Sequence, residues 1–374
     1  FFTLYIIKIR VIQELAVAAG IGTVIVTFTN LILVKLLFSY FGISPKRVEM
    51  TRDSLANHPK IWVWISRMAE PRIAMTSLVI AGLLAVGAYV GSRGLKIGDL
   101  DAGAPELRPD SVYNKDFAFM SGNYSLSPDV MIVMVETPKD KCTSYGAVEA
   151  VDRFGWVMEN VPGVQRAVST NVFAKRVMAG YNEGNPKWSE LNKIPEILNN
   201  SVQNVPTDLI NVSCDMTFVY LFLENHKEEV LARVTEAAEK FASEHNNPDV
   251  AVFKLAVGTS GMEAAIDQTI KEAARPMLWI VYAIVVLMCW ITFSFSFTAT
   301  LCVITPLVLT SMLCEAIMAQ LGMGVKIGTL PVIALGVGIG VDYGIYIYSK
   351  MQEYLDKGLS VQEAYLETLS VTGK

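Results

Sequence analysis

A single aspartate lies within an apolar, glycine-rich stretch near the end of the sequence. Asp342 is followed by Tyr343 in GVGIGVDYGIYIYSK, residues 336–350. A charged group inside a bilayer is costly and usually faces the protein interior or a water-filled path. A carboxyl shielded from water has its pKa raised toward neutrality, so it can take up a proton on one side and release it on the other. The pattern predicts a proton-carrying site at Asp342 with Tyr343 beside it. A protonated acid that only hydrogen-bonds another helix is the structural alternative.

Three glycines accompany the aspartate at helical spacing. Gly336, Gly340 and Gly344 recur every four residues and therefore line one face of a helix. A stripe of small residues lets another helix approach closely. We expect this packing to bury the helix flank beside Asp342 against protein rather than lipid.

Few other residues of the sequence are candidates for a chemical role. Glu315 lies near the outer end of an apolar run. Two interpretations are open: a second charged residue that takes part in transport, and a residue at the membrane interface. Cys142 and Cys214 are the two cysteines of the polar middle segment, and they would pair in an oxidising compartment or stay as free thiols. The chain has three histidines and no HExxH, CxxC, GxSxG or GxxxxGK[ST] motif. We therefore expect no enzyme activity, no metal site and no cofactor.

The composition is that of a membrane protein. Of 374 residues 52% are hydrophobic and 18% charged, and the mean hydropathy is +0.39. Five apolar runs reach the roughly 20 residues that cross a bilayer: 15–38, 73–90, 277–297, 300–320 and 327–349. Residues 1–9 would be the tail of another span.

The polar segment 92–275 has the composition of a globular domain. It carries 18 Lys and Arg against 26 Asp and Glu, a net charge of −8, which argues against nucleic acid as a partner. Strand-like apolar runs predict strands at 129–135, 164–168, 216–223 and 250–255, and helical spacing of apolar residues predicts helices at 145–160, 227–245 and 261–275. Two βαβ units of this kind interleave into a split βαβ sheet of ferredoxin type. The predicted fold class is a polytopic α-helical membrane protein with an external α+β domain.

The distribution of basic residues predicts the orientation. The loop 42–72 and the tail that starts at Lys350 are cytoplasmic by the positive-inside rule; the loop carries Lys46, Arg47, Arg52, Lys60, Arg67 and Arg72. The segment 92–275 then lies outside, in the periplasm of a Gram-negative cell. The same loop favours an amphipathic helix on the inner membrane surface, or a plain helix packed under the bundle, through Ile61, Trp62, Trp64, Ile65 and Met68.

Motif, order and topology together match a known family. TLPVIALGVGIGVDYGIYIYSK, residues 329–350, closely resembles the tenth membrane helix of resistance-nodulation-division (RND) exporters. The resemblance is to the branch with the mycobacterial MMPL lipid exporters, the hopanoid exporters and the sterol-sensing-domain proteins. LKIGDLDAGAPELRPDSVYNKDFAF, residues 95–119, is similar to the start of their second external domain, and ELAVAAGIGTVIVTFTNLIL, residues 14–33, to their sixth helix.

The resemblance implies twelve spans in two similar halves, of which this chain is an internal piece. The implied segments are 1–41, the end of helix five and helix six; 42–72, a cytoplasmic amphipathic linker; 73–91, helix seven; 92–275, a periplasmic porter-like domain; 276–350, helices eight to ten; and 351–374, a cytoplasmic loop toward helix eleven.

The resemblance also implies a function. Relatives export by proton antiport with Asp-Tyr pairs on the fourth and tenth helices, and Asp342 and Tyr343 match the second pair. We expect a proton-motive-force-driven exporter of hydrophobic or amphiphilic molecules, chiefly lipids, in the bacterial inner membrane. The alternatives are a lipid- or sterol-sensing or lipid-trafficking protein without vigorous pumping, and a multidrug efflux component. The expected partners are membrane lipids, a hydrophobic substrate, protons, and a second copy or an accessory periplasmic protein.

Overall fold

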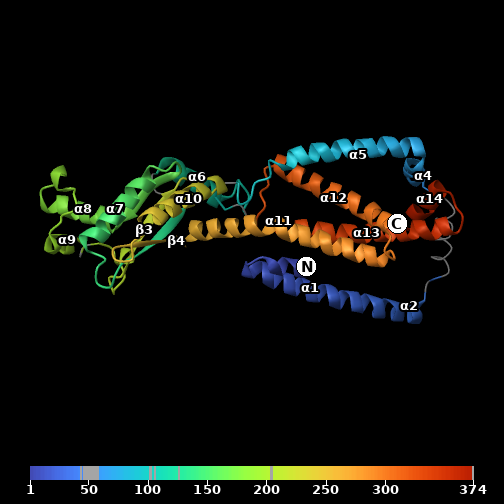
Figure 1. Ribbon diagram of the computed structural model, residues 1–374, viewed down its shortest axis with the longest axis horizontal. Coiled ribbons are helices and arrows are strands. Elements are labelled where there is room, and N and C mark those ends of the chain that lie inside the picture. The colour runs from blue at the N-terminus through green and yellow to red at the C-terminus, as the bar shows by residue number, and fades with distance from the viewer. Residues whose placement is uncertain are drawn as a thin grey trace. The chain divides into compact units, whose positions relative to one another are not determined.

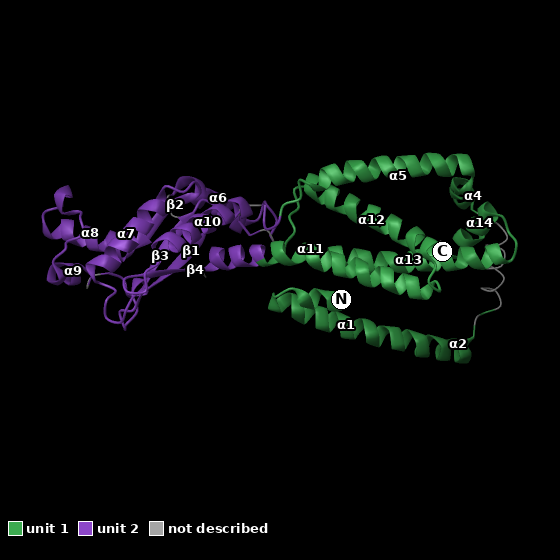
Figure 2. Ribbon diagram, in the orientation of Figure 1, with its two compact units in different colours: residues 1–96, 269–374 green, residues 97–268 purple. Residues whose placement is uncertain are grey.

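The computed structural model describes residues 1–42, 44, 59–100, 103–104, 107–124, 127–202 and 205–372. They form two compact units, shown in different colours in Figure 2. Unit 1 is Phe1–Lys96 with Thr269–Lys374, and unit 2 is Ile97–Gln268. Three basic residues of the orientation argument lie outside the described residues: Lys46, Arg47 and Arg52.

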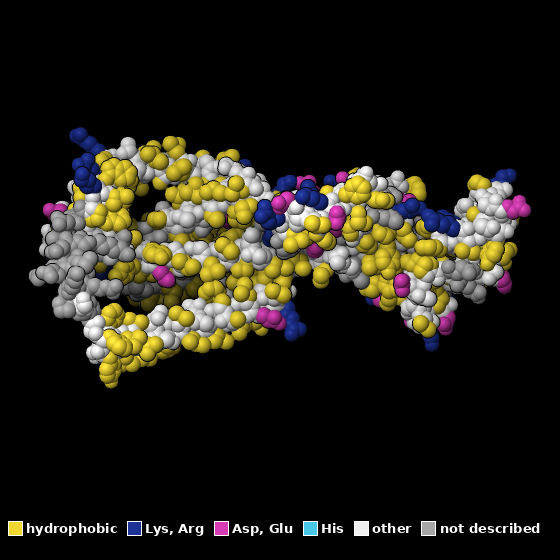
Figure 3. All heavy atoms as spheres, turned by 180° about the vertical axis from the view of Figure 1, so that it is seen from behind, with side chains coloured by type: hydrophobic (Ala, Val, Ile, Leu, Met, Phe, Trp, Pro, Cys, Tyr) yellow, Lys and Arg dark blue, Asp and Glu magenta, His cyan; other side chains and the backbone are white. Residues whose placement is uncertain are grey.

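Five helices among the described residues are long and apolar enough to cross a membrane. They are Arg10–Phe41, α5 (Pro71–Ser92), α11 (Thr259–Thr292), α12 (Phe297–Gln320) and α13 (Leu330–Asp356). The first consists of α1 (Arg10–Thr29), a π-helical turn η2 (Asn30–Val34) and α2 (Lys35–Phe41). Hydrophobic side chains cover much of the surface of the unit 1 helices (Figure 3). The five predicted spans are therefore confirmed as helices, and the exposed apolar surface suits a lipid environment.

Local signals set the ends of these helices. Pro71 occupies the first turn of α5, where its missing N–H is not needed. The Ser296 hydroxyl caps α12 by accepting the Ala299 N–H at 3.4 Å. α11 begins with charged turns, and its apolar part starts at Met277 after Lys271, Glu272 and Arg275. The first half of α11 therefore precedes the membrane-spanning part of the helix.

Helix α12 packs against both α5 and α13 in unit 1, as Figure 1 shows. A Cβ on Gly91 of α5 would lie 3.2 Å from the Ala316 Cβ of α12, so the two helices approach closely. α11 joins this bundle through a shared apolar core with α12 and α13. The 3-10 helix η1 (Phe2–Ile6) packs on α1.

Two short segments of the predicted linker are helical. α4 (Lys60–Ser66) and the 3-10 helix η3 (Arg67–Ala69) pack against α14 (Val361–Thr372), and Ser66 is buried in that contact. On the other side of α4, Ile61 and Trp64 are exposed. The helix therefore combines features of the two expected arrangements: it packs on another helix and presents an apolar face.

The sheet of unit 2 has four strands, each antiparallel to its neighbours. They are β1 (Val130–Glu136), β2 (Val164–Ser169), β3 (Met216–Leu223) and β4 (Val252–Val257), in the order β2-β3-β1-β4. α7 (Tyr145–Glu159) connects β1 to β2, and α10 (Glu228–His245) connects β3 to β4. This order and connectivity are those of a split βαβ sheet, so the ferredoxin-type prediction is confirmed.

One face of the sheet forms the core with α7 and α10. Alternate residues of β1 and β3 are buried, as expected for a sheet with helices on one side. The rings of Phe154 on α7, Phe241 on α10 and Phe253 on β4 meet with centroids 4.9–5.2 Å apart. These contacts fix both helices on the sheet and join the two βαβ units into one core.

Several elements of unit 2 were not predicted. α6 (Val112–Asn123) precedes β1, and α8 (Thr170–Tyr181), η4 (Pro186–Trp188), α9 (Pro195–Val202) and η5 (Thr207–Leu209) fill the connection from β2 to β3. β4 begins at Val252, later than the run 250–255 suggested.

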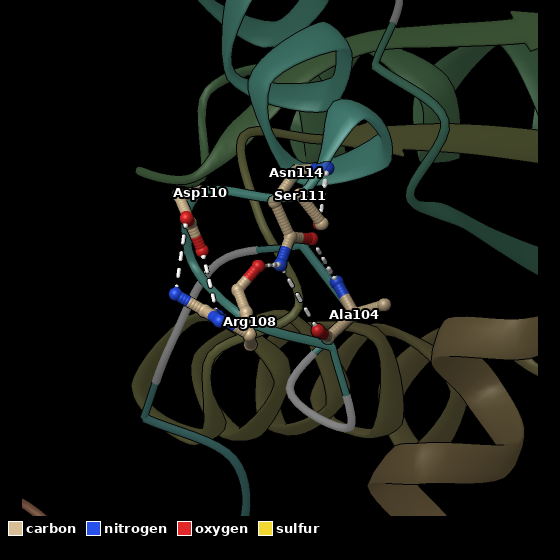
Figure 4. Close-up of polar contacts among 5 residues, drawn as sticks. All are labelled: Ala104, Arg108, Asp110, Ser111 and Asn114. Atoms are coloured by element: carbon tan, nitrogen blue, oxygen red, sulfur yellow. Dashed lines mark hydrogen bonds and ion pairs between the residues drawn. The ribbon is translucent and has the colours of Figure 1, made fainter.

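A side-chain clasp orders the approach to α6 (Figure 4). The Asn114 amide donates to the carbonyls of Ala104 at 3.2 Å and Arg108 at 3.0 Å, and its Oδ1 accepts the Ala104 N–H at 2.9 Å. Ser111 caps the helix by accepting the Asn114 N–H at 3.3 Å. Gly103 is required here because its φ is +93° and a Cβ would lie 2.5 Å from the Asn114 Oδ1.

Candidate functional site

Asp342 lies near the middle of α13. Thr329 precedes the helix, and Pro331 occupies its first turn. At 1.5 Å per residue Asp342 is about 18 Å along the axis from Leu330. Asp342 and Tyr343 are both exposed on the surface of this chain, and no hydrogen bond or ion pair joins the Asp342 carboxyl to another described residue. The carboxyl is therefore open to a further partner.

The glycine stripe faces α12, and Asp342 does not. A Cβ on Gly340 would lie 2.7 Å from the Leu307 Cδ1, and one on Gly344 would lie 2.9 Å from the Val303 Cγ1. Gly336 has nothing within 4 Å. Asp342 is two residues from both packing glycines, about 200° around a helix of 3.6 residues per turn.

The flank beside Asp342 is consequently not buried within this chain, in contrast to the expectation. The glycines bring α12 against one side of α13, and the acid lies on the opposite side. Of the three glycines of the stripe, Gly340 and Gly344 lie against α12 and Gly336 does not. The spacing alone does not show which other residues share that face, because this depends on the rotation per residue of the helix.

Three helices meet around an apolar core next to this site. Val303 and Leu307 of α12 and Val337 and Val341 of α13 are buried there together with Val281 and Cys289 of α11. A polar bond crosses between α11 and α12: the Tyr282 hydroxyl donates to the Ser311 Oγ at 2.7 Å. A buried polar group needs such a partner in an apolar bundle.

Glu315 lies one turn after Ser311 on α12 and is half-buried. Its carboxylate interacts electrostatically with Arg275 of α11 and with Tyr282. The structure therefore places Glu315 in a polar cluster between α11 and α12. Asp342 belongs to a different helix, α13. Tyr282 was not among the predicted site residues, and its only sequence signal was a tyrosine within an apolar run.

Cys142 and Cys214 form a disulfide with their Cα atoms 5.0 Å apart. The bond joins the loop after β1 to the turn before β3, across 72 residues. The Cys142 N–H also donates to the Cys214 carbonyl at 3.1 Å. Of the two states that the sequence left open, the structure has the paired one.

A buried histidine–aspartate pair in unit 2 was missed in the sequence. The Nδ1 of His226, before α10, lies 3.0 Å from the Asp129 Oδ1, before β1. The hydrogen bond to Asp129 raises the pKa of His226 above its ordinary value, although burial opposes it. The sequence separation of 97 positions hid the pair from a reading of local motifs. Among the described residues, no group of three or more His, Cys, Asp and Glu is arranged to hold a metal ion.

This fold, with apolar helices and one sheet domain, defines a multi-pass membrane protein with an extramembrane α+β domain. The sequence profile of the MMPL family matches residues 120–374, more than half of the chain. The chain therefore belongs to the MMPL family of membrane transporters, within the RND superfamily, and transporters of this family are generally not enzymes. No curated protein matches the chain in a sequence search.

Proposed function

We propose that this protein exports hydrophobic or amphiphilic molecules, chiefly lipids, and that proton movement through Asp342 drives the export. The observation that carries the proposal is the position of Asp342: an acid near the middle of an apolar helix, next to Tyr343, with no partner among the described residues. An ionisable residue inside a membrane helix is a functional site by default. Membership of a transporter family supports the same conclusion.

The proposed coupling starts from the cost of a charge in the membrane. Protonation neutralises the Asp342 carboxyl, removes that cost and lets the exposed face of α13 pack against a neighbouring helix. Ionisation favours water access on that face. The close contact of Gly340 and Gly344 with α12 would pass the shift of α13 to the bundle. Alternating access of one half of a transporter against the other is the expected scheme.

We place the protein in the bacterial inner membrane, with residues 92–275 in the periplasm. Lys60 and Arg67 precede α5, Arg72 lies in its first turn, and Lys350 follows the apolar part of α13, which supports a cytoplasmic position for both segments. The Cys142–Cys214 disulfide supports an oxidising compartment for unit 2. The proposed partners are membrane lipids, protons, the hydrophobic substrate, and a second copy or an accessory periplasmic protein.

The test of the energy coupling uses the full-length protein in liposomes that contain the pH indicator pyranine. An imposed pH gradient is expected to dissipate faster with the unmodified protein than with Asp342→Asn, by at least about tenfold, because the amide cannot carry a proton. Asp342→Glu keeps a carboxyl and is expected to retain part of the flux. Asp356→Asn changes an exposed aspartate at the end of the same helix and is the matched control.

Undiminished flux with a correctly inserted Asp342→Asn protein would contradict the proposal. The substrate class is tested by mass spectrometry of the lipids that co-purify with the full-length protein, compared with the bulk membrane. One strongly enriched lipid class is then the transport probe. An enriched lipid without proton flux would favour lipid sensing, and no enrichment would favour small amphiphiles and efflux.

A further inference from the structure

The two chain connections of unit 2 meet at a glycine and an aspartate. Unit 2 starts at Ile97 and ends at Gln268, and Gly98 and Asp267 lie next to these ends. A Cβ on Gly98 would lie 2.4 Å from the Asp267 Oδ2 and 3.0 Å from the Glu228 Cβ. Gly98 is buried and its φ is +93°, a conformation that favours glycine. The Asp267 carboxyl therefore lies directly on the backbone of the entering segment.

Carboxylates from three segments surround this contact. Asp99 belongs to the entering segment, Glu228 begins α10, and Glu263 lies one turn before Asp267 on α11. All three act electrostatically on Asp267. The Glu228 N–H also donates to the Asp99 carbonyl at 3.4 Å, which ties α10 to the same segment. Four carboxyls in this space repel one another when all are ionised.

His226 contributes the opposite charge to the same cluster. Its side chain is buried, with 6% of the residue exposed, and its Nδ1 is held by Asp129. The Nε2, on the other edge of the ring, has no hydrogen-bond partner among the described residues. The ring interacts electrostatically with Asp99, Glu263 and Asp267. A buried, unpaired ring nitrogen beside an acidic cluster marks a place where protons can bind and leave.

We propose that Asp267 and His226 form a proton-controlled clasp, which holds the entering segment at Gly98 and Asp99 against α10 and α11 when protonated and loosens it when deprotonated. With protons bound, Asp267 is neutral on the Gly98 backbone and His226 is a cation facing carboxylates. With protons lost, Asp267 adds a fourth negative charge and His226 no longer balances it. The clasp lies wholly in unit 2, and it does not depend on the role of Asp342.

The acid–base properties set the pH at which the clasp works. Burial, followed by the charges of Asp99, Glu228 and Glu263, raises the pKa of Asp267 from 3.8 to about 7. Because the folded pKa is higher than that of the opened segment, the closed clasp holds the proton more tightly. Closure is then favoured below about pH 7, and it weakens as pH rises from about 4 to about 7. The raised pKa of His226 acts in the same direction.

The test is hydrogen exchange of the full-length protein in nanodiscs, followed by mass spectrometry of peptides that cover 95–100 and 259–268. Labelling times are scaled for the intrinsic pH dependence of exchange. For one carboxyl with these two pKa values, linkage predicts about tenfold more opening at pH 8 than at pH 6. In Asp267→Asn the ratio is expected to fall well below tenfold, because the main titrating group is gone and only the contribution of His226 remains.

Two further variants shift the midpoint in opposite directions. Glu228→Gln removes a negative neighbour, so the midpoint of opening moves to lower pH. His226→Gln removes a positive neighbour, so the midpoint moves to higher pH. Asp152→Asn is the matched control, since its carboxylate pairs with the Lys175 Nζ at 2.6 Å, and it keeps the tenfold ratio.

Three results would overturn the clasp: a ratio near one in the unmodified protein, an unchanged ratio in Asp267→Asn, or midpoints that do not move in the Glu228 and His226 variants. Asp342→Asn is expected to lose proton flux and keep the tenfold ratio. Failure of the clasp and failure of the proposed transport function are therefore separately visible.

Discussion

At the scale of single residues, several polar side chains of this protein stabilise the local backbone through their hydrogen bonds. Asn114 joins the N–H and C=O groups of a loop that no strand or helix satisfies, and the Ser111 hydroxyl holds the start of α6. Asp342, in contrast, holds nothing within the described residues. A polar group without a local structural partner in an apolar helix is the stronger candidate for function, because structure alone does not account for it.

Asn114 gives a residue-scale prediction about stability. Asn114→Ala removes three hydrogen bonds to Ala104 and Arg108, and we expect it to destabilise the α6 region by about 1–3 kcal/mol. Asn114→Asp keeps the acceptor for the Ala104 N–H and loses both amide donations. It should therefore also destabilise the region, with a carboxylate placed beside two carbonyls. Local hydrogen exchange of peptides from residues 107–124 measures the change.

Asn123→Ala is the control for that change. Among the described residues, the Asn123 amide donates locally to the Phe119 carbonyl, at 2.8 Å on the exposed side of α6. Its removal is expected to alter exchange by much less. Equal effects of the Asn114 and Asn123 variants would show that the three Asn114 hydrogen bonds add no stability beyond an ordinary helix contact.

The sequence predicted individual residues unevenly. Asp342 and Tyr343 stand out because a charge among apolar neighbours is a local signal. The Asp267 cluster and the His226–Asp129 pair do not, since their charges lie in polar segments and come together only through the sheet topology. Residue type and spacing reveal a site when its members share one helix, and not when four segments supply them.

At the scale of elements, helix contact in unit 1 depends on glycines of different importance. Gly344 faces Val303, whose β-branched side chain has little rotameric freedom, at a distance that a Cβ could not keep. Gly340 faces the end of the more flexible Leu307 side chain. Gly336 faces open space. The three glycines of the stripe therefore differ in how strongly the packing of α13 requires a glycine.

This difference predicts the outcome of alanine substitutions on α13. Gly344→Ala forces α12 and α13 apart, and we expect a loss of about 1–3 kcal/mol from overpacking. Gly336→Ala introduces no contact and should be neutral or slightly stabilising, by up to about 1 kcal/mol, because alanine favours a helix. Thermal unfolding of both full-length variants in the same detergent compares them. A Gly344→Ala protein as stable as Gly336→Ala would show that this helix pair is not closely packed.

Element prediction succeeded where periodicity was strong. The continuous apolar run MTFVYLFL gave the bounds of β3, Met216–Leu223, and in the structure every second residue of the run is buried. α8 and α9 are short, with 12 and 8 residues, so their apolar spacing extends over few helical turns and is a weaker signal. α11 was expected as a polar helix and a separate span, but it runs through Pro276 without a break. Pro276 has no N–H, so the helix continues there with one backbone hydrogen bond fewer.

At the scale of the whole molecule, composition alone separated two environments. The apolar runs predicted the helices of unit 1, and the acidic segment 92–275 predicted a folded domain close to unit 2, Ile97–Gln268. Topology followed from the order of the predicted strands, because two βαβ units have few ways to share one sheet. The sequence left open whether Cys142 and Cys214 are paired or free, since it does not show whether their Cα atoms approach each other.

The disulfide provides the prediction for the whole molecule, because it reports the compartment as well as stability. The chain has five cysteines, and Cys289, Cys302 and Cys314 are free. If unit 2 is periplasmic, denatured full-length protein taken from cells should react with a maleimide at three of these cysteines without reductant and at all five with it. The Cys142→Ser/Cys214→Ser variant should lose about 2–5 kcal/mol of stability, because the bond constrains the unfolded chain. Cys302→Ser, which changes a free cysteine, is the control. Five reactive cysteines before reduction would place unit 2 in a reducing compartment and contradict the proposed orientation, whatever the stability of the variant.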